Sequence, residues 1–130
     1  MPSEPTPPVR ALRAFRGATQ VDADDAGEIL AATRELLEAI VADNALDDAD
    51  VMEVLFTATP DLHAAFPAEA ARELGWADVP LLCSQEMDVT GGLPRCVRVL
   101  LRAHTTRTRA EVRHVYLRGA HALRPDLSSG

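Results

Sequence analysis

Arginine is the residue type in this sequence with the clearest potential for chemistry, because its placement is uneven. All 13 basic residues are arginine, against 20 acidic residues, and the formal net charge is −7. Only Arg34 and Arg72 interrupt the acidic stretch between residues 22 and 78, whereas the balance reverses over residues 95–124. A coding bias toward GC-rich codons accounts for the missing lysine more easily than for this clustering. Since a guanidinium binds carboxylate or phosphate through a planar two-point fork, the clustering predicts a localised anion site.

The sequence lacks the motifs of several other kinds of catalytic site. Cys83 and Ser84 have no glycine-flanked turn of the kind that carries a hydrolase nucleophile. The Gly91-Gly92 pair lacks the lysine and the following helix of a phosphate-binding loop. None of the four histidines pairs with cysteine, histidine or a carboxylate at the spacing of a strong metal site; they are His63, His104, His114 and His121. We therefore expect no metal and no cofactor.

The remaining polar candidates fall at strand ends or on one strand face. Alternation along a strand expected at 95–104 directs Arg98 to the side opposite Val97 and Val99. The segment 113–117 alternates in the same way, so Arg98 and Tyr116 are expected to share one sheet face. The candidate residues selected in this way are Arg16, Glu86, Arg98, Tyr116 and Arg124.

The hydrophobic pattern predicts the elements that position these residues. Strands are expected at 9–15, 51–57, 79–84, 95–104 and 113–117. One helix is expected from a capping box formed by Asp25 and Glu28 to about residue 42, with Asn44 as a C-terminal cap.

A second helix is expected after the break at Pro60. Asp61 can cap it, Leu74 lies in its last turn, and Gly75 occupies the usual C-terminal position. Pro67 is expected to interrupt or bend its first turns, because proline lacks the backbone N–H.

Together these elements predict an α/β (α+β) fold with a mixed sheet of about five strands and two helices on one face. The apolar strand at 51–57 is expected to be buried on both sides. Two helices leave the other sheet face uncovered, and in so small a chain a half-apolar uncovered face suggests burial by further copies. A symmetric homo-oligomer is therefore expected.

Length and composition limit the class of protein. A chain of 130 residues with 47% apolar content predicts a single domain at 9–130, after a proline-rich, disordered leader at 1–8. The absence of a membrane-length apolar run and of a secretory signal predicts a cytoplasmic protein with no membrane partner, in which Cys83 and Cys96 are free thiols. The net acidic charge argues against binding to nucleic acid.

Five short motifs occur in order along the chain, and together they are more specific than any one of them. They are Arg16-Gly17-Ala18-Thr19, Thr57-Ala58-Thr59-Pro60-Asp61-Leu62, Cys83-Ser84-Gln85-Glu86-Met87-Asp88-Val89, Arg113-His114-Val115-Tyr116-Leu117 and Leu123-Arg124-Pro125-Asp126-Leu127. This series resembles the monofunctional AroH-type chorismate mutases, and the likeness extends from about residue 9 to residue 128.

The resemblance implies an isomerase that converts chorismate to prephenate by an intramolecular Claisen rearrangement, the committed step toward phenylalanine and tyrosine. No cofactor is needed, because the enzyme has only to select a folded conformer and stabilise charge. The family's fold is ferredoxin-like, and it forms a homotrimer whose sheets build a pseudo α/β barrel with active sites at the subunit clefts.

The resemblance also assigns roles to residues. Arg98 is expected to face the ether oxygen, Arg16 and Tyr116 to hold the pyruvyl carboxylate, and Glu86 to accept a hydrogen bond from the ring hydroxyl. The wall and entrance of the site are assigned to Phe66, Ala68, Arg72, Leu81, Leu82, Cys83 and Arg124.

The sequence departs from the family pattern at a few positions. Glu69 stands where relatives can carry lysine, and Gln20 stands where a second threonine often follows. The chain also stops soon after Leu127, so a longer tail that closes the site is not expected. Two other classes remain open from the residues alone: a YjgF-like imine deaminase, and an anion-sensing or single-stranded nucleic-acid module that uses residues 95–113.

Overall fold

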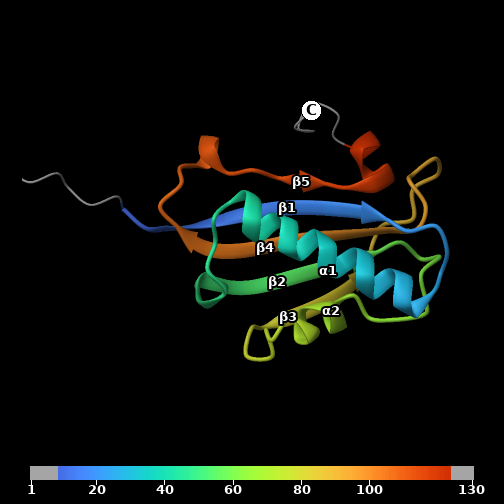
Figure 1. Ribbon diagram of the computed structural model, residues 1–130. Coiled ribbons are helices and arrows are strands. Elements are labelled where there is room, and N and C mark those ends of the chain that lie inside the picture. Colours follow the sequence, from blue (N-terminus) through green and yellow to red (C-terminus); the bar gives the residue numbers. More distant parts are fainter. Residues whose placement is uncertain (1–8, 124–130) are drawn as a thin grey trace, which may run out of the picture.

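The computed structural model describes residues 9–123 and contains one five-stranded mixed sheet (Figure 1). The strand order is β3-β2-β4-β1-β5, where β1 is Ala11–Gln20, β2 is Val51–Ala58, β3 is Leu81–Gln85, β4 is Cys96–Thr105 and β5 is Val115–Tyr116. The central strand β4 runs antiparallel to β1 and β2, while β3 and β5 pair in parallel with their neighbours. The expected five-stranded mixed sheet is confirmed.

Two α-helices and three short 3-10 turns complete the described chain. They are α1 (Ala26–Asp43), α2 (Ala68–Glu73), η1 (Asp48–Asp50), η2 (Arg109–Glu111) and η3 (Arg118–Leu123). The long helix α1 crosses one face of the sheet, and the shorter α2 lies beside it near β3 (Figure 1). None of the helices within residues 9–123 is both long and apolar enough to cross a membrane.

The helix α1 begins where the sequence predicts. The carboxylate of Asp25 accepts a hydrogen bond from the backbone N–H of Glu28 at 2.9 Å, which satisfies one of the free donors of the first turn. The carboxylate of Glu28 reaches back to the N–H of Asp22. Ile29, Leu36 and others at helical spacing are fully buried, so the amphipathic stripe faces the sheet as expected.

The end of α1 is joined to the chain that enters β5. Asn44 is the C-terminal cap and is almost fully buried. Its amide nitrogen donates to the carbonyl groups of Ile40, at 2.9 Å, and Arg113, at 2.8 Å, while its amide oxygen accepts the N–H of Arg113 at 2.8 Å. Because every polar atom of this buried side chain is satisfied, it fixes the approach of β5 to the helix.

The prediction of the second helix is wrong in its first half. The helix α2 covers only Ala68–Glu73, with Pro67 at the N-cap position, and the chain before it is irregular. Asp61 does not cap a helix, because its carboxylate accepts the N–H of Arg95 at 3.0 Å. The end is as predicted, since Gly75 follows the helix with a φ of 91°.

The first strand is longer than predicted. Instead of ending at Phe15, β1 pairs with β4 as far as Gln20. Gly17, two residues beyond the predicted end, lies within β1 and under α1: a Cβ there would be 2.8 Å from the Cδ1 of Ile40. Glycine is therefore needed for the close approach of helix and strand rather than for a break.

The hydrophobic core lies between the helices and one face of the sheet. Phe15, Phe56 and Leu101 are fully buried there. On the opposite face η3 covers only the part near β5, where Ala18 and Cys96 are buried, whereas β2 is open: Leu55 and Thr57 are partly exposed there. The expectation that this strand is buried on both sides is wrong for a single chain, because the two helices lie on the same face.

Candidate active site

The register of the sheet brings the main candidates into one row across the face opposite α1. Arg98 on β4 lies directly opposite Thr57 on β2 and Ala18 on β1, and Ala18 in turn pairs with Tyr116 on β5. The prediction that Arg98 and Tyr116 share a sheet face is therefore confirmed. Ala18 is small and fully buried between them, so the two longer side chains rise on either side of it.

Glu86 is held next to Arg98 at the end of β3. The Nε of Arg98 lies 3.4 Å from the Oε2 of Glu86. The hydroxyl of Thr57 donates to the same oxygen at 2.9 Å, and the N–H of Met87 donates to Oε1 at 3.1 Å. Both carboxylate oxygens are engaged, so Glu86 has a fixed orientation before any ligand binds.

Arg16 borders the same region from β1. Its backbone N–H donates to the Nδ1 of His114 at 2.9 Å, which links β1 to the residue just before β5. Among residues 9–123 no carboxylate lies within ion-pair distance of Arg16, whereas Arg98 has Glu86. Two guanidiniums and one carboxylate give this region a net positive charge, which suits an anionic ligand.

A cavity of about 340 Å³ lies over this row, and we call it the open-face cavity. Its lining consists of Arg16, Gly17, Leu55, Thr57, Arg98, Val99, Leu100, Tyr116 and Leu123. Three of the four residues expected to be catalytic therefore line one cavity, and the fourth, Glu86, is attached to it through its ion pair with Arg98.

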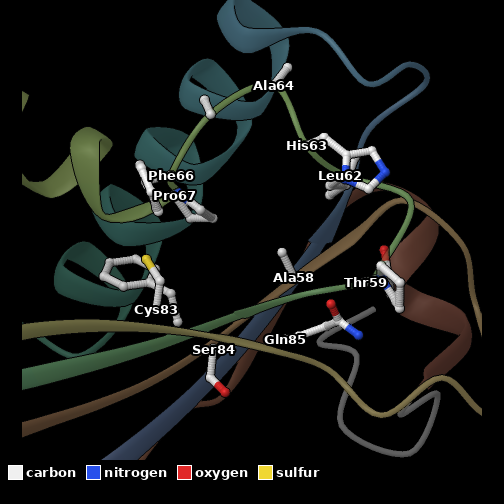
Figure 2. Close-up of a pocket in the computed structure, with 13 residues that line it drawn as sticks. Ala58, Thr59, Leu62, His63, Ala64, Phe66, Pro67, Cys83, Ser84 and Gln85 are labelled. Atoms are coloured by element: carbon white, nitrogen blue, oxygen red, sulfur yellow. The ribbon is translucent and has the colours of Figure 1, made fainter.

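Phe66 and Cys83 belong to a different cavity, of about 400 Å³, which we call the loop cavity. Figure 2 shows that the irregular segment carrying Leu62, Phe66 and Pro67 lies over the strands that carry Ala58 and Cys83. The side chain of Phe66 is 72% exposed, which leaves a large aromatic surface without a partner within the described chain.

Strand alternation explains why the two cavities are separate. Ser84 pairs with Thr57, which is opposite Arg98, so the side chain of Ser84 points to the face of the open-face cavity, although Ser84 itself borders the loop cavity at the sheet edge. Cys83 precedes it in β3, points to the other face and packs against the main core. In one chain Cys83 therefore lies on the opposite side of the sheet from Arg98 and Tyr116.

The other residues assigned to the wall and entrance are dispersed. Ala68 is buried in α2, and Arg72 is exposed on the same helix and bonded to Glu69 at 3.0 Å. Leu81 packs against the core, whereas the neighbouring Leu82 is 65% exposed on the opposite side of β3. Arg124 lies outside the described residues.

The two cysteines are free thiols in different environments. Cys96 is buried among Ala18, Tyr116 and Ala120, and this burial raises the pKa of its thiol, although the nearby Arg98 partly opposes the shift. A buried thiol with a raised pKa is a poor nucleophile. Cys83 is half-buried at the loop cavity.

Asp61 stabilises the start of β4, the strand that carries Arg98, by accepting the N–H of Arg95. Burial raises the pKa of its carboxyl, but hydrogen bonds from the hydroxyl of Thr59 and the N–H of Arg95 outweigh it and lower the pKa overall. Thr59 also accepts the N–H of Cys96 at 2.9 Å, so this cluster fixes the start of β4 two residues before Arg98.

Sequence reasoning missed Thr57 as a site residue. Its role depends on lying opposite Arg98 and within reach of Glu86, and only the strand register supplies that information. The apolar wall formed by Leu55, Leu100 and Leu123 was missed for the same reason. Among the residues that the structure describes, no three His, Cys, Asp or Glu side chains form a group that could hold a metal ion.

The fold and the open-face cavity define an α+β protein with a cationic site on a sheet face. Its donors are guanidiniums and a phenol, and its acceptor is a fixed carboxylate. This arrangement can orient a small anion and stabilise developing negative charge, and its described residues offer no activated nucleophile.

The chain belongs to the chorismate mutase type I family, whose family model matches residues 12–127. It is 52% identical over 118 residues to the chorismate mutase AroH of Bacillus subtilis, which covers 90% of this chain and 93% of that protein. It is 48% identical over 119 residues to the chorismate mutase AroH of Thermus thermophilus, covering 91% and 98% respectively. The resemblance drawn from the five motifs is thus confirmed, and a YjgF-like deaminase is excluded.

A solved chorismate mutase structure has the same fold as this chain. The chorismate mutase from Clostridium thermocellum superposes with a TM-score of 0.83 at 44% sequence identity, over 85% of this chain and 98% of that one.

Proposed function

We propose that this protein is a chorismate mutase that converts chorismate to prephenate in aromatic amino acid biosynthesis. Membership of the family and the high coverage of its relatives support the reaction. The observation that carries the proposal from the structure is that Arg16, Arg98 and Tyr116 line one cavity, with Glu86 attached to it through its ion pair with Arg98. Chorismate carries two carboxylates, and the excess positive charge of this cavity suits them.

Arg98 is proposed to donate to the ether oxygen of chorismate. As the C–O bond breaks, negative charge grows on that oxygen, so a guanidinium fixed beside it binds the transition state more strongly than the ground state. The hydrogen bonds from the hydroxyl of Thr57 and the N–H of Met87 to Glu86 support this role. They fix the carboxylate, and the fixed carboxylate keeps the guanidinium of Arg98 in position.

Arg16 and Tyr116 are proposed to hold the pyruvyl carboxylate, and Glu86 to accept a hydrogen bond from the ring hydroxyl. A hydrogen bond to a charged group contributes about 1.5–3 kcal/mol, so three or four focused on the transition state could supply about 8 kcal/mol. That is near the lower end of enzymatic rate enhancement. No covalent intermediate is required.

A second copy of the chain is proposed to complete the site. The open-face cavity and the loop cavity lie on opposite sides of one sheet, so the edge of one subunit that carries Phe66 and Cys83 would close the open-face cavity of the next. The exposed Phe66 and Leu82 support this contact, since a partner would bury them. A homotrimer of the pseudo-barrel kind, in the cytoplasm, is the proposed assembly.

The reaction is tested by following the loss of chorismate absorbance with purified protein in the presence of a metal chelator. Chromatography then identifies the product. Rapid formation of prephenate supports the proposal, whereas a folded protein that leaves chorismate unchanged contradicts it.

The shared site is tested by mixing two inactive variants. Arg98→Ala removes a residue of the open-face cavity, and Arg72→Glu places a negative charge in the other group. If each site combines the two groups from adjacent subunits, co-folded mixtures regain about one quarter of the wild-type activity, because a mixed interface can carry both intact groups. Mixtures that stay inactive, although sedimentation shows mixed oligomers, contradict a shared site.

A further inference from the structure

A third cavity lies on the described chain and shares no lining residue with the other two. Its volume is about 370 Å³. The polar part of its lining consists of Arg13, Arg102, Arg109 and His114, and no acidic side chain lines it. We call it the terminal cavity, because it lies where β1 begins and β4 ends.

Two of these arginines have no acidic partner. Six arginines within residues 9–123 form ion pairs with carboxylates, and Arg102 is one of them, at 2.8 Å from Glu53. Neither Arg13 nor Arg109 forms an ion pair with a carboxylate in the described part of the chain. Arg13 donates only its Nε, to the carbonyl of Arg107 at 3.2 Å. In a chain with seven more acidic than basic residues, two arginines without a carboxylate partner in the lining of one cavity indicate an anion site.

The rest of the lining is apolar. Leu12, Ala14 and Val112 form it, and Leu12 is 43% exposed. A ligand that matches both parts carries a carboxylate or phosphate together with a short carbon skeleton. We propose that the terminal cavity binds a small organic anion of this kind, separately from the substrate in the open-face cavity.

His114 connects the two cavities. It lines the terminal cavity, while its Nδ1 accepts the backbone N–H of Arg16, which lines the open-face cavity. A neutral imidazole that accepts at Nδ1 carries its hydrogen on Nε2. An anion in the terminal cavity that affects this imidazole therefore also affects the main chain of Arg16. This coupling rests on the proposed function, whereas anion binding itself does not.

Binding is tested by calorimetry with inorganic phosphate and, separately, with citrate, at constant ionic strength so that screening does not change. The measurements use the Arg98→Ala background, which weakens the anion affinity of the open-face cavity. The test variant adds Arg109→Gln. The matched control adds Arg34→Gln, which makes the same charge change on an exposed arginine that pairs with Glu73 at 2.7 Å, away from the terminal cavity.

We expect the control to bind at least one probe, and we expect the Arg109→Gln variant to bind the same probe about tenfold more weakly. The probe that binds more tightly shows whether the cavity prefers a phosphate or a carboxylate ligand. Equal affinities for the two variants, or no binding at millimolar probe, overturn the proposal. Sedimentation checks that the oligomeric state is the same in all variants.

The coupling is tested with the otherwise unmodified enzyme. The probe that binds is expected to change the KM for chorismate in the wild type and to leave it unchanged in Arg109→Gln. A KM that stays constant at saturating probe in both proteins overturns the coupling. If the protein has no mutase activity, the proposed function fails and the calorimetric result still decides the site.

Discussion

The Nε of Arg98 lies 3.4 Å from the Oε2 of Glu86, although Arg98 is on β4 and Glu86 directly follows β3, which is not a neighbour of β4 in the sheet. β2 lies between them and contributes Thr57, which donates to the same oxygen. The ion pair therefore spans β2, and its geometry depends on the register of three strands. Replacing Arg98, Glu86 or Thr57 therefore removes a different contact, and each replacement has its own expected effect on activity.

Arg98→Ala is expected to abolish turnover while the fold survives. Removing one focused donor for developing negative charge costs about 10²–10³ in kcat, and here a whole guanidinium is lost. The side chain is 47% exposed, so stability changes little. Steady-state kinetics and thermal unfolding check the two parts, with Arg34→Gln as the control, and a mutant that retains near-full activity would remove Arg98 from the central role.

Thr57→Val is expected to lower kcat/KM by about tenfold, because a hydrogen bond to a charged group is lost and Glu86 gains freedom. Thr57→Ser keeps the hydroxyl and should restore most of the activity. Comparing the three proteins separates the hydrogen bond from the bulk of the side chain. If the valine and serine variants are equally active, Thr57 does not position Glu86.

Gly17→Ala is expected to destabilise the fold by about 1–3 kcal/mol, the usual cost of overpacking. The added methyl group would lie 2.8 Å from the Cδ1 of Ile40 and 3.0 Å from the Cδ1 of Leu36. Gly27→Ala in the first turn of α1 is the control, because its nearest contact is an ordinary 3.4 Å and alanine favours the helix. Denaturant unfolding measures both, and equal stability of the two variants would contradict the close approach.

Asp61→Asn is expected to lower stability at neutral pH and to leave it less sensitive to acid. The pKa of Asp61 in the folded protein lies below the ordinary value of 3.8, because hydrogen bonds to the carboxylate outweigh the effect of burial. The stabilisation is therefore present above pH 3.8 and is lost as the pH falls through the lower, folded value. Thermal unfolding from pH 7 to pH 2 checks this, and a difference between the proteins that stays constant with pH contradicts it.

The sequence alone determined the elements whose signals are local. The capping pair Asp25 and Glu28 and the buried stripe of α1 placed that helix, since each feature depends on residues three or four apart. Alternation in β4 placed Arg98 opposite the core side for the same reason. The five ordered motifs indicated the family, and the resemblance to that family then assigned most of the candidate residues.

The tertiary structure decided what depends on distant parts of the chain. The carboxylate of Asp61 accepts the N–H of Arg95 instead of starting a helix, and β1 continues under α1 through Gly17 instead of ending at residue 15. The register joined Thr57 to Glu86 and Arg98, and it separated Cys83 from them on the opposite face. These outcomes depend on which strands become neighbours, and no local pattern specifies that choice, because the pairing energy comes from residues that are far apart in sequence.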